Sequence, residues 1–216
     1  MKKAVIFDMD GVLVDSQPFH FEVDRITLCE CGFPATPDEV KPYAGMATVD
    51  RFTKYKKDYA IPKDVSDIIN ICEKVRTGLL KTAQFEPIDG IPALLRSLKE
   101  RKIKTAVASS SSDALIGLIL DALGIRAYFD VLLSGENMPH SKPAPDIFLA
   151  AAEKLGCSPD ESIVIEDSTN GVAAAKNANM RCVGFYNPNS GNQDISKADM
   201  IIDRFQTLLD DDAWLG

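Results

Sequence analysis

Two carboxylates stand close together near the start of the chain. Asp8 and Asp10 come directly after the apolar run 4–7, and Gly11 follows them. Such a run is typical of a short buried strand, and residues just beyond the carboxyl end of a parallel strand lie where ligands bind. The two carboxylates repel each other, so a hard cation such as Mg²⁺ would help to keep both ionised. The alternative is an acidic turn in which Gly11 supplies an unusual backbone angle.

Further polar groups follow later apolar runs in the same way. They are Ser109 and Ser110 after the run 105–108, Lys142 in the loop beyond 131–133, and Glu166 with Asp167 after 162–165. The carboxyl ends of neighbouring parallel strands converge on one crevice, so we expect these groups to share a site. Together they offer acids for Mg²⁺, donors for a phosphate group, and a cation. Singly, each is equally well explained as a helix cap, a surface lysine or a turn.

Most of the chain alternates between strand and helix patterns. From Pro87 onwards, helical spacing of apolar residues separates the short β-branched runs, and the runs 182–185 and 200–202 complete the set. This alternation predicts an α/β fold, a doubly wound parallel sheet with right-handed crossovers.

The segment after the first strand has a different sequence pattern, because it lacks the short β-branched runs that mark strands elsewhere in the chain. Thr36 followed by Pro37 and two acids is a strong helix start, and we expect that helix to extend towards Gly45. Ser66 begins a further helical stripe. The sequence therefore predicts a small all-helical domain of residues 16–82, inserted after the first strand of a core made of residues 1–15 and 83–216.

Composition limits the partners. A length of 216 residues suits one sizeable domain or one domain with a smaller insert, and the net charge of −8 argues against nucleic acid. It leaves room for a small phosphorylated ligand, because a local metal ion and lysine can override the global field. We find no signal-peptide pattern and no run long enough to span a membrane, and the five cysteines are scattered. We expect a cytoplasmic monomer with reduced thiols and no membrane partner.

The polar groups, taken in order, resemble the motifs of the haloacid-dehalogenase-like superfamily of aspartate-nucleophile phosphotransferases. The four matching stretches are DMDGVLVDS at 8–16, ASSS at 108–111, SKPAPDIF at 141–148 and IEDSTNG at 165–171. The resemblance spans nearly all of the chain outside 16–82, and that insert resembles the family's small helical cap on a Rossmann-like core. More narrowly, the chain is similar to the branch that holds β-phosphoglucomutases and phosphatases of sugar phosphates.

The resemblance implies a two-step reaction. Asp8 would attack phosphorus and form an aspartyl-phosphate, which splits one difficult displacement into two. Asp10 would protonate the leaving oxygen and then activate the water that hydrolyses the intermediate. An acid at the position of Asp10 implies phosphate-ester chemistry rather than dehalogenation.

The resemblance also implies how charge is handled. Mg²⁺ would be held by the Asp8 carboxylate, the Asp10 backbone carbonyl and Asp167, with Glu166 close by, directly or through water. The phosphoryl oxygens would be held by Ser109, the Ser110 backbone and Lys142.

Residues of the helical insert bear on the choice between phosphatase and mutase. In the mutases that this chain resembles, an arginine lies three residues after the hinge glycine; here Thr48 lies three after Gly45. Arg51, one helical turn beyond Thr48, is a partial substitute. His20 matches a histidine of the mutases, but related phosphatases often carry one too.

Three other positions depart from the mutases. Ser112 and Asp113 stand where a lysine and an asparagine follow the second motif's serines, and Asp24 replaces a tryptophan. Losing these partners of a second phosphate costs binding energy, so we predict a Mg²⁺-dependent phosphatase of a small phosphorylated metabolite, preferably a sugar phosphate. The alternatives are a β-phosphoglucomutase-type mutase and a non-catalytic module that binds a phosphometabolite. The module is disfavoured because competent residues fill every catalytic position.

Overall fold

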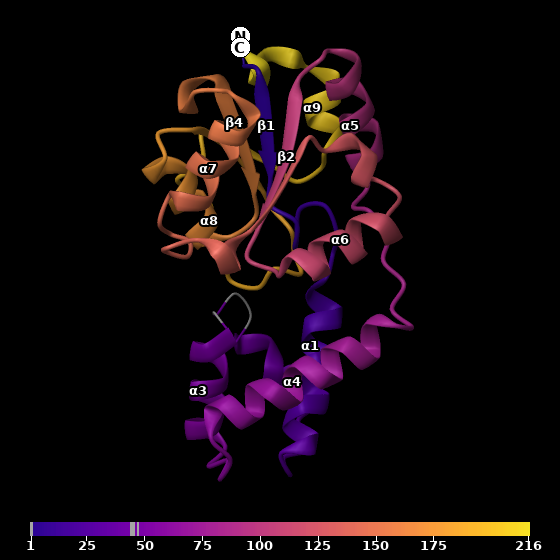
Figure 1. Cartoon of the computed structure of the whole chain (residues 1–216), viewed down its shortest axis with the longest axis vertical. Coiled ribbons are helices and arrows are strands. Elements are labelled where there is room, and N and C mark those ends of the chain that lie inside the picture. Colours follow the sequence, from indigo (N-terminus) through magenta and orange to yellow (C-terminus); the bar gives the residue numbers. More distant parts are fainter. Residues whose placement is uncertain (1, 44–45, 47) are drawn as a thin grey trace. The chain divides into compact units, whose positions relative to one another are not determined.

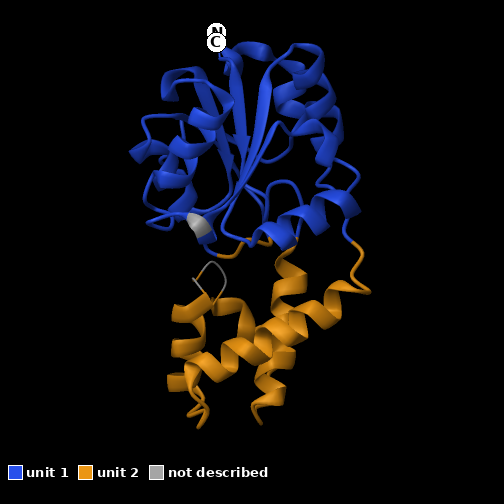
Figure 2. Cartoon of the chain, viewed as in Figure 1, with its two compact units in different colours: residues 1–15, 85–188, 192–216 blue, residues 16–84, 189–191 orange. Residues whose placement is uncertain are grey.

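The computed structural model describes residues 2–43, 46 and 48–216. Its chain divides into two compact units (Figure 2). An α/β unit consists of residues 1–15, 85–188 and 192–216, and a helical unit consists of residues 16–84 and 189–191. Residues 83–84 and 189–191, which the sequence assigns to the core, cluster with the helical unit in the structure.

The α/β unit is built on a parallel sheet of six strands in the part of the chain that the structure describes, in the order β3-β2-β1-β4-β5-β6, and Figure 1 shows β1 between β4 and β2. The first strand lies inside the sheet, and later strands are added on either side of it, as expected for a doubly wound sheet. This confirms the predicted fold class. The strands are β1 Ala4–Phe7, β2 Lys104–Ser109, β3 Val131–Ser134, β4 Ser162–Glu166, β5 Arg181–Phe185 and β6 Met200–Ile202.

Strand β1 lies in the middle of the sheet and all four of its residues are fully buried. Its last residue, Phe7, is in register with Val107 of β2 and Ile165 of β4. The strands therefore end at a common edge, and the polar residues that follow them are brought together there.

Helices cover both faces of this sheet (Figure 1). Helices α7 and α8 lie on one face, and α5, α6 and α9 lie on the other. Small side chains, Ala106 and Ala108 of β2 and Ala151 of α7, are buried between sheet and helix and allow close packing. The bounds are α5 Ile91–Glu100, α6 Asp113–Ala122, α7 Asp146–Leu155, α8 Thr169–Asn177 and α9 Gln206–Asp210, with single 3₁₀ turns at Arg126–Tyr128, Gly135–Asn137, Pro159–Glu161 and Asp212–Leu215.

The helical unit has a hydrophobic core of its own. Side chains from three of its helices meet there, among them Val23, Phe52, Tyr55 and Ile68. Among the residues described, no helix of the chain is long and apolar enough to cross a membrane. The unit contains α1 Gln17–Glu30, α2 Pro37–Val40, a 3₁₀ turn at Lys41–Tyr43, α3 Thr48–Asp58 and α4 Val65–Leu80.

One helix prediction in this unit was wrong. Helix α2 was expected to continue towards Gly45, but it ends at Val40 and is followed by a 3₁₀ turn. Pro42 explains the early end, because it has no N–H to donate to the carbonyl four residues earlier. Gly45 itself lies outside the described residues.

Candidate active site

The chain turns sharply after β1, and the turn carries Asp8 and Asp10. Its backbone closes on itself through the Gly11 N–H, which donates to the Val14 carbonyl at 2.8 Å. Gly11 has a φ of 86°, which L-residues with side chains rarely adopt, so glycine is required there. The buried Asn187 side chain, beyond β5, donates to the Gly11 carbonyl at 3.0 Å. The turn is thus fixed both from within and from another strand end.

Lys142 lies between two buried carboxylates at this edge. Its Nζ is 2.5 Å from Asp8 Oδ1 and 2.7 Å from Glu166 Oε1, and it also donates to the Ala108 carbonyl at 3.1 Å. The Lys142 side chain is only 8% exposed. The structure therefore brings together three predicted site residues that lie far apart in the sequence.

Burial and charge shift the proton affinities of this cluster. Burial is the largest influence on Asp8 and, with the charges of Glu166 and Asp10, raises the pKa of Asp8 to about 7 against the opposing effect of Lys142. Burial alone would lower the pKa of Lys142, but the carboxylates of Asp8 and Glu166 outweigh it and raise that pKa above its usual value. Lys142 is therefore a permanent positive charge at this edge.

Glu166 has donors of the chain on both of its oxygens. Oε1 accepts from Lys142, and Oε2 accepts from the backbone N–H groups of Asp167 and Ser168, each at 2.8 Å, and from the Ser168 hydroxyl at 2.9 Å. Helix α8 passes so close that a Cβ on Gly171 would overlap the Glu166 carboxylate. Glu166 thus links β4, Lys142 and the start of α8.

Asp10 is contacted by two serines at the end of β2. Its Oδ2 accepts from the Ser111 hydroxyl at 2.9 Å and from the Ser109 hydroxyl at 3.3 Å. Ser109 is buried, whereas Ser110 is exposed. Ser111 was not singled out from the sequence, since four consecutive serines give no sign of which hydroxyl faces the site.

The donor set suits Mg²⁺ in its chemistry. The carboxylates of Asp8, Asp10, Glu166 and Asp167 lie at the ends of two paired strands, and the Lys142 ammonium pairs with two of them. Among the described residues, no three His, Cys, Asp or Glu side chains are arranged to hold a metal ion. This is compatible with Mg²⁺, which usually takes one or two carboxylates and keeps several waters.

The helical unit holds the other predicted residues. Arg51 Nε is 2.8 Å from Asp24 Oδ2, and Arg51 Nη1 donates to the Met46 carbonyl at 2.9 Å. Asp24, also bonded to the Tyr55 hydroxyl at 3.1 Å, is almost fully buried, and burial raises its pKa. Arg51 is therefore neutralised by a carboxylate of its own unit. Thr48 begins α3, and His20, on α1, is close enough to Asp24 to influence its pKa.

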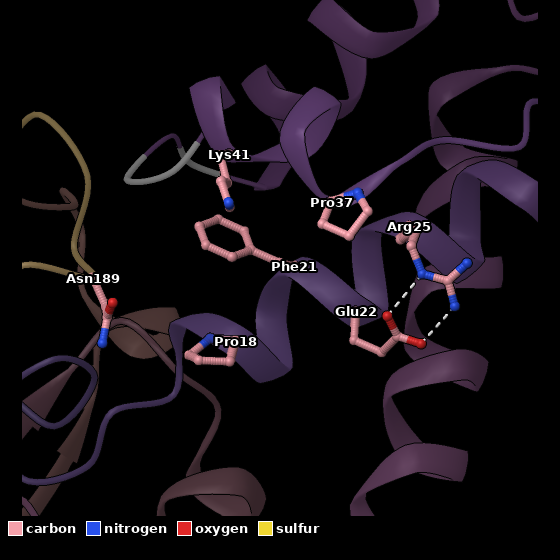
Figure 3. Close-up of a pocket in the computed structure, with 7 residues that line it drawn as sticks. All are labelled: Pro18, Phe21, Glu22, Arg25, Pro37, Lys41 and Asn189. Carbon is pink, nitrogen blue, oxygen red and sulfur yellow. Dashed lines mark hydrogen bonds and ion pairs between the residues drawn. The ribbon is translucent and has the colours of Figure 1, made fainter.

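A separate pocket of about 290 Å³ lies in the helical unit (Figure 3). Lys41 points towards the ring of Phe21, and two of the lining residues, Glu22 and Arg25, pair with each other. None of the described residues that line it belongs to the predicted site. The lining residues are Pro18, Phe21, Glu22, Arg25, Pro37, Lys41 and Asn189.

Comparison with known proteins gives several matches. The family model described as haloacid dehalogenase-like hydrolase matches residues 5–185. The phosphorylated carbohydrates phosphatase of Thermotoga maritima is 32% identical over 177 residues, which are 82% of this chain and 81% of that protein. Protein SUPPRESSOR OF QUENCHING 1, chloroplastic, of Arabidopsis thaliana is 37% identical over 187 residues, but the match spans only 17% of its length. The crystal structure of β-phosphoglucomutase from Clostridium difficile has a TM-score of 0.78 at 26% identity, covering 96% of this chain and 93% of that one.

Proposed function

Since the chain belongs to the haloacid dehalogenase-like hydrolases, we propose that it is a Mg²⁺-dependent phosphatase of a small phosphorylated metabolite, preferably a sugar phosphate. The observation that carries this proposal is the buried Asp8 carboxylate, held 2.5 Å from Lys142 Nζ. It lies at the strand edge where Asp10 and the serines also meet. The relative named phosphorylated carbohydrates phosphatase supports the substrate class.

In the first step, an oxygen of Asp8 bonds to phosphorus while the bond from phosphorus to the leaving oxygen breaks. Asp10 gives its proton to that oxygen, so the alcohol leaves neutral and Asp8 carries the phosphoryl group. Asp10 lies two residues from Asp8 on the same closed turn, which brings both carboxyl groups to one substrate bond.

In the second step, water attacks the phosphorus of the aspartyl-phosphate. Asp10, now ionised, takes a proton from the water, and the bond between phosphorus and the Asp8 oxygen breaks. Inorganic phosphate leaves, and both carboxyl groups return to their starting states.

Three donors would hold the phosphoryl oxygens: the Ser109 hydroxyl, the Ser110 backbone N–H and the Lys142 ammonium. Lys142 suits this role because its charge is permanent and its position is fixed by two carboxylates. Glu166 would act by positioning Lys142, as donors of the chain already engage both of its oxygens.

We assign the metal ligands to Asp8, the Asp10 backbone carbonyl and Asp167. When bound there, Mg²⁺ would neutralise the repulsion between an anionic nucleophile and an anionic substrate. Asp8 and Asp167 are both nearly buried, and the Asp8 N–H donates to the Ile165 carbonyl of β4 at 3.0 Å. That backbone contact joins the two acidic turns.

A mutase is the second candidate, supported by the likeness to a β-phosphoglucomutase structure and by His20. A mutase must bind a second phosphate with cationic donors while its intermediate is protected from water. Arg51, the one substitute that the sequence suggested, is already paired with Asp24 and the Met46 carbonyl. Asp113, at the start of α6, would repel a second phosphate. These contacts favour the phosphatase.

The test measures phosphate release from glucose 6-phosphate, ribose 5-phosphate and sorbitol 6-phosphate with Mg²⁺. We expect turnover of at least one of them, and a loss of about a thousandfold or more in Asp8→Asn, which lacks the attacking charge. The matched control is Asp203→Asn, an exposed acid directly after β6, which should keep full activity. Binding without turnover by the unmodified protein would instead favour the non-catalytic module.

The same assay distinguishes phosphatase from mutase. The substrate here is β-glucose 1-phosphate, given with a trace of the 1,6-bisphosphate. We expect free phosphate to be formed from it faster than glucose 6-phosphate is formed. If glucose 6-phosphate forms with negligible phosphate release, the protein is a mutase.

A further inference from the structure

Ser111 has all of its polar groups engaged at the active-site edge. Its hydroxyl donates to Asp10 Oδ2 at 2.9 Å, and its backbone N–H donates to Ser109 Oγ at 3.0 Å. Its carbonyl accepts from the Ser134 hydroxyl, at the end of β3, at 2.7 Å. The backbone of Ser111 is thus fixed from two sides, and its hydroxyl is directed at Asp10.

The loop beyond β3 gives the serines little room to move. Ser134 is buried, and its hydroxyl also accepts from the Glu136 N–H at 3.1 Å, so its own orientation is fixed. A Cβ on Gly135 would lie 3.2 Å from Ser110 Cα and 3.3 Å from the Ser109 carbonyl oxygen, which shows how closely the two loops approach. The contact between Ser111 and Asp10 is therefore built into the packing of β2 against β3.

Ser109 contacts the same oxygen of Asp10, but in the proposed function its hydroxyl also binds the substrate's phosphoryl group. A hydroxyl group has one proton to donate, and at 3.3 Å the bond to Asp10 is the longer of the two. If Ser109 donates to an arriving phosphoryl oxygen, as the proposed function requires, Asp10 loses that donor. Ser111 then keeps Asp10 in place.

We propose that Ser111 is the positioning residue of Asp10. Its hydroxyl holds Oδ2, so that Oδ1 is the oxygen that carries the proton to the leaving group and takes it from water. When the Ser109 hydroxyl donates to the substrate's phosphoryl group instead, the Ser111 hydroxyl remains hydrogen-bonded to the Asp10 carboxyl. This inference rests on the proposed acid–base function of Asp10.

The test compares Ser111→Ala with the unmodified protein on two substrates: the fastest of the three sugar phosphates, and p-nitrophenyl phosphate. The sugar alkoxide needs a proton to leave, whereas p-nitrophenolate hardly does. We expect kcat/KM, which reports the steps up to departure of the leaving group, to fall by about tenfold on the sugar phosphate and by less than about twofold on p-nitrophenyl phosphate. On the sugar phosphate KM should not rise by more than about twofold, because Ser111 does not bind the substrate in this scheme.

Two variants separate positioning from structure. Ser111→Thr keeps a hydroxyl and should restore most of kcat on the sugar phosphate. Ser112→Ala loses a neighbouring hydroxyl that accepts from the Leu115 N–H as the cap of α6, and it should leave kcat on both substrates unchanged. If Ser111→Ala does not fold, Ser111→Cys, of nearly equal size and with a weak donor, takes its place in the same comparison.

Equal losses of kcat/KM on both substrates would overturn the proposal, as would a raised KM with an unchanged kcat, or a threonine variant that restores nothing. If the unmodified protein hydrolyses none of the substrates, the proposed function fails, and crystal structures with and without inorganic phosphate decide the inference. A Ser109 hydroxyl turned to phosphate while Ser111 still holds Asp10 supports it. An Asp10 carboxyl detached from Ser111 overturns it.

Discussion

Asp8 is a carboxyl group that the fold keeps almost entirely out of water. Burial, aided by the negative charges of Glu166 and Asp10, raises its pKa from 3.8 to about 7, although Lys142 opposes the shift. The unfolded chain has no such environment, so its Asp8 ionises near the ordinary value. Folding is therefore linked to proton uptake at this residue when no metal ion is present.

The sign of the effect follows from proton counting. Between pH 3.8 and about 7, the folded chain keeps a proton on Asp8 that the unfolded chain has lost, so the contribution of Asp8 to stability falls as pH rises through this range. We expect that, in chelator, the unfolding free energy of the unmodified protein falls between pH 5 and pH 8 relative to that of Asp8→Asn. Urea denaturation of both proteins at the two pH values measures it. A difference that does not change with pH would contradict the assigned shift.

The types of the residues that we propose to react could be predicted from the sequence, because acids and serines directly after buried runs stand out. The contacts between side chains could not be predicted. The ion pair between Asp24 and Arg51 joins residues on two helices, and nothing in the sequence around either residue indicates the other. The contact of Ser111 with Asp10 could not be predicted for another reason. Which serine hydroxyl reaches Asp10 depends on the course of the backbone after β2.

Helix α8 depends on a glycine for its close approach to Glu166. A Cβ on Gly171 would overlap that carboxylate, which Lys142 and three donors near the start of α8 hold in place. We expect Gly171→Ala to push Glu166 away from Lys142 and to lower the unfolding free energy by about 3 kcal/mol. Urea denaturation at pH 7 measures the loss, and phosphate release should fall with it.

Gly78 offers the matched control, since it lies within α4 and a Cβ there would meet no described atom within 4 Å. Gly78→Ala should stabilise the protein by about 0.5–1 kcal/mol, because alanine is the better helix former. If the two alanine variants are equally stable, the tight packing of α8 over Glu166 is not what requires Gly171.

The strands were predictable because most of them are short, largely buried apolar runs of the sheet. Strand β6, Met200–Ile202, coincides with its predicted range, and β2 extends only one residue further at each end. Helices of the smaller unit were harder to predict. In α3 only Phe52 and Tyr55 are buried, too few to reveal a period, and Pro42 ends the ordered helix before it. The spacing of apolar residues therefore does not predict the bounds of these helices, whereas Pro42 accounts for one of them.

For the whole molecule, the proposed metal site makes the stability of the folded chain depend on the concentration of Mg²⁺. A cation that binds the folded chain and not the unfolded one stabilises it by about 2.7 kcal/mol at a hundred times its Kd. In a protein of this size that corresponds to a rise in Tm of about 5 °C or more. We expect this rise when Mg²⁺ is added after chelation, measured by calorimetry without any substrate.

Asp167 provides the decisive variant for that measurement, because it is buried beside the Asp8 turn and we assign it no part in the bonds that form or break. Asp167→Asn should abolish the Mg²⁺-induced rise in Tm while the protein stays folded, since an amide replaces an anionic ligand at nearly the same size. Asp203→Asn also neutralises an acid that directly follows a strand, but an exposed one at the outermost strand of the sheet, and it should keep the full rise. If Mg²⁺ shifts the melting of all three proteins equally, the cation binds elsewhere, and the excess of carboxylates over Lys142 at the strand edge is not a metal site.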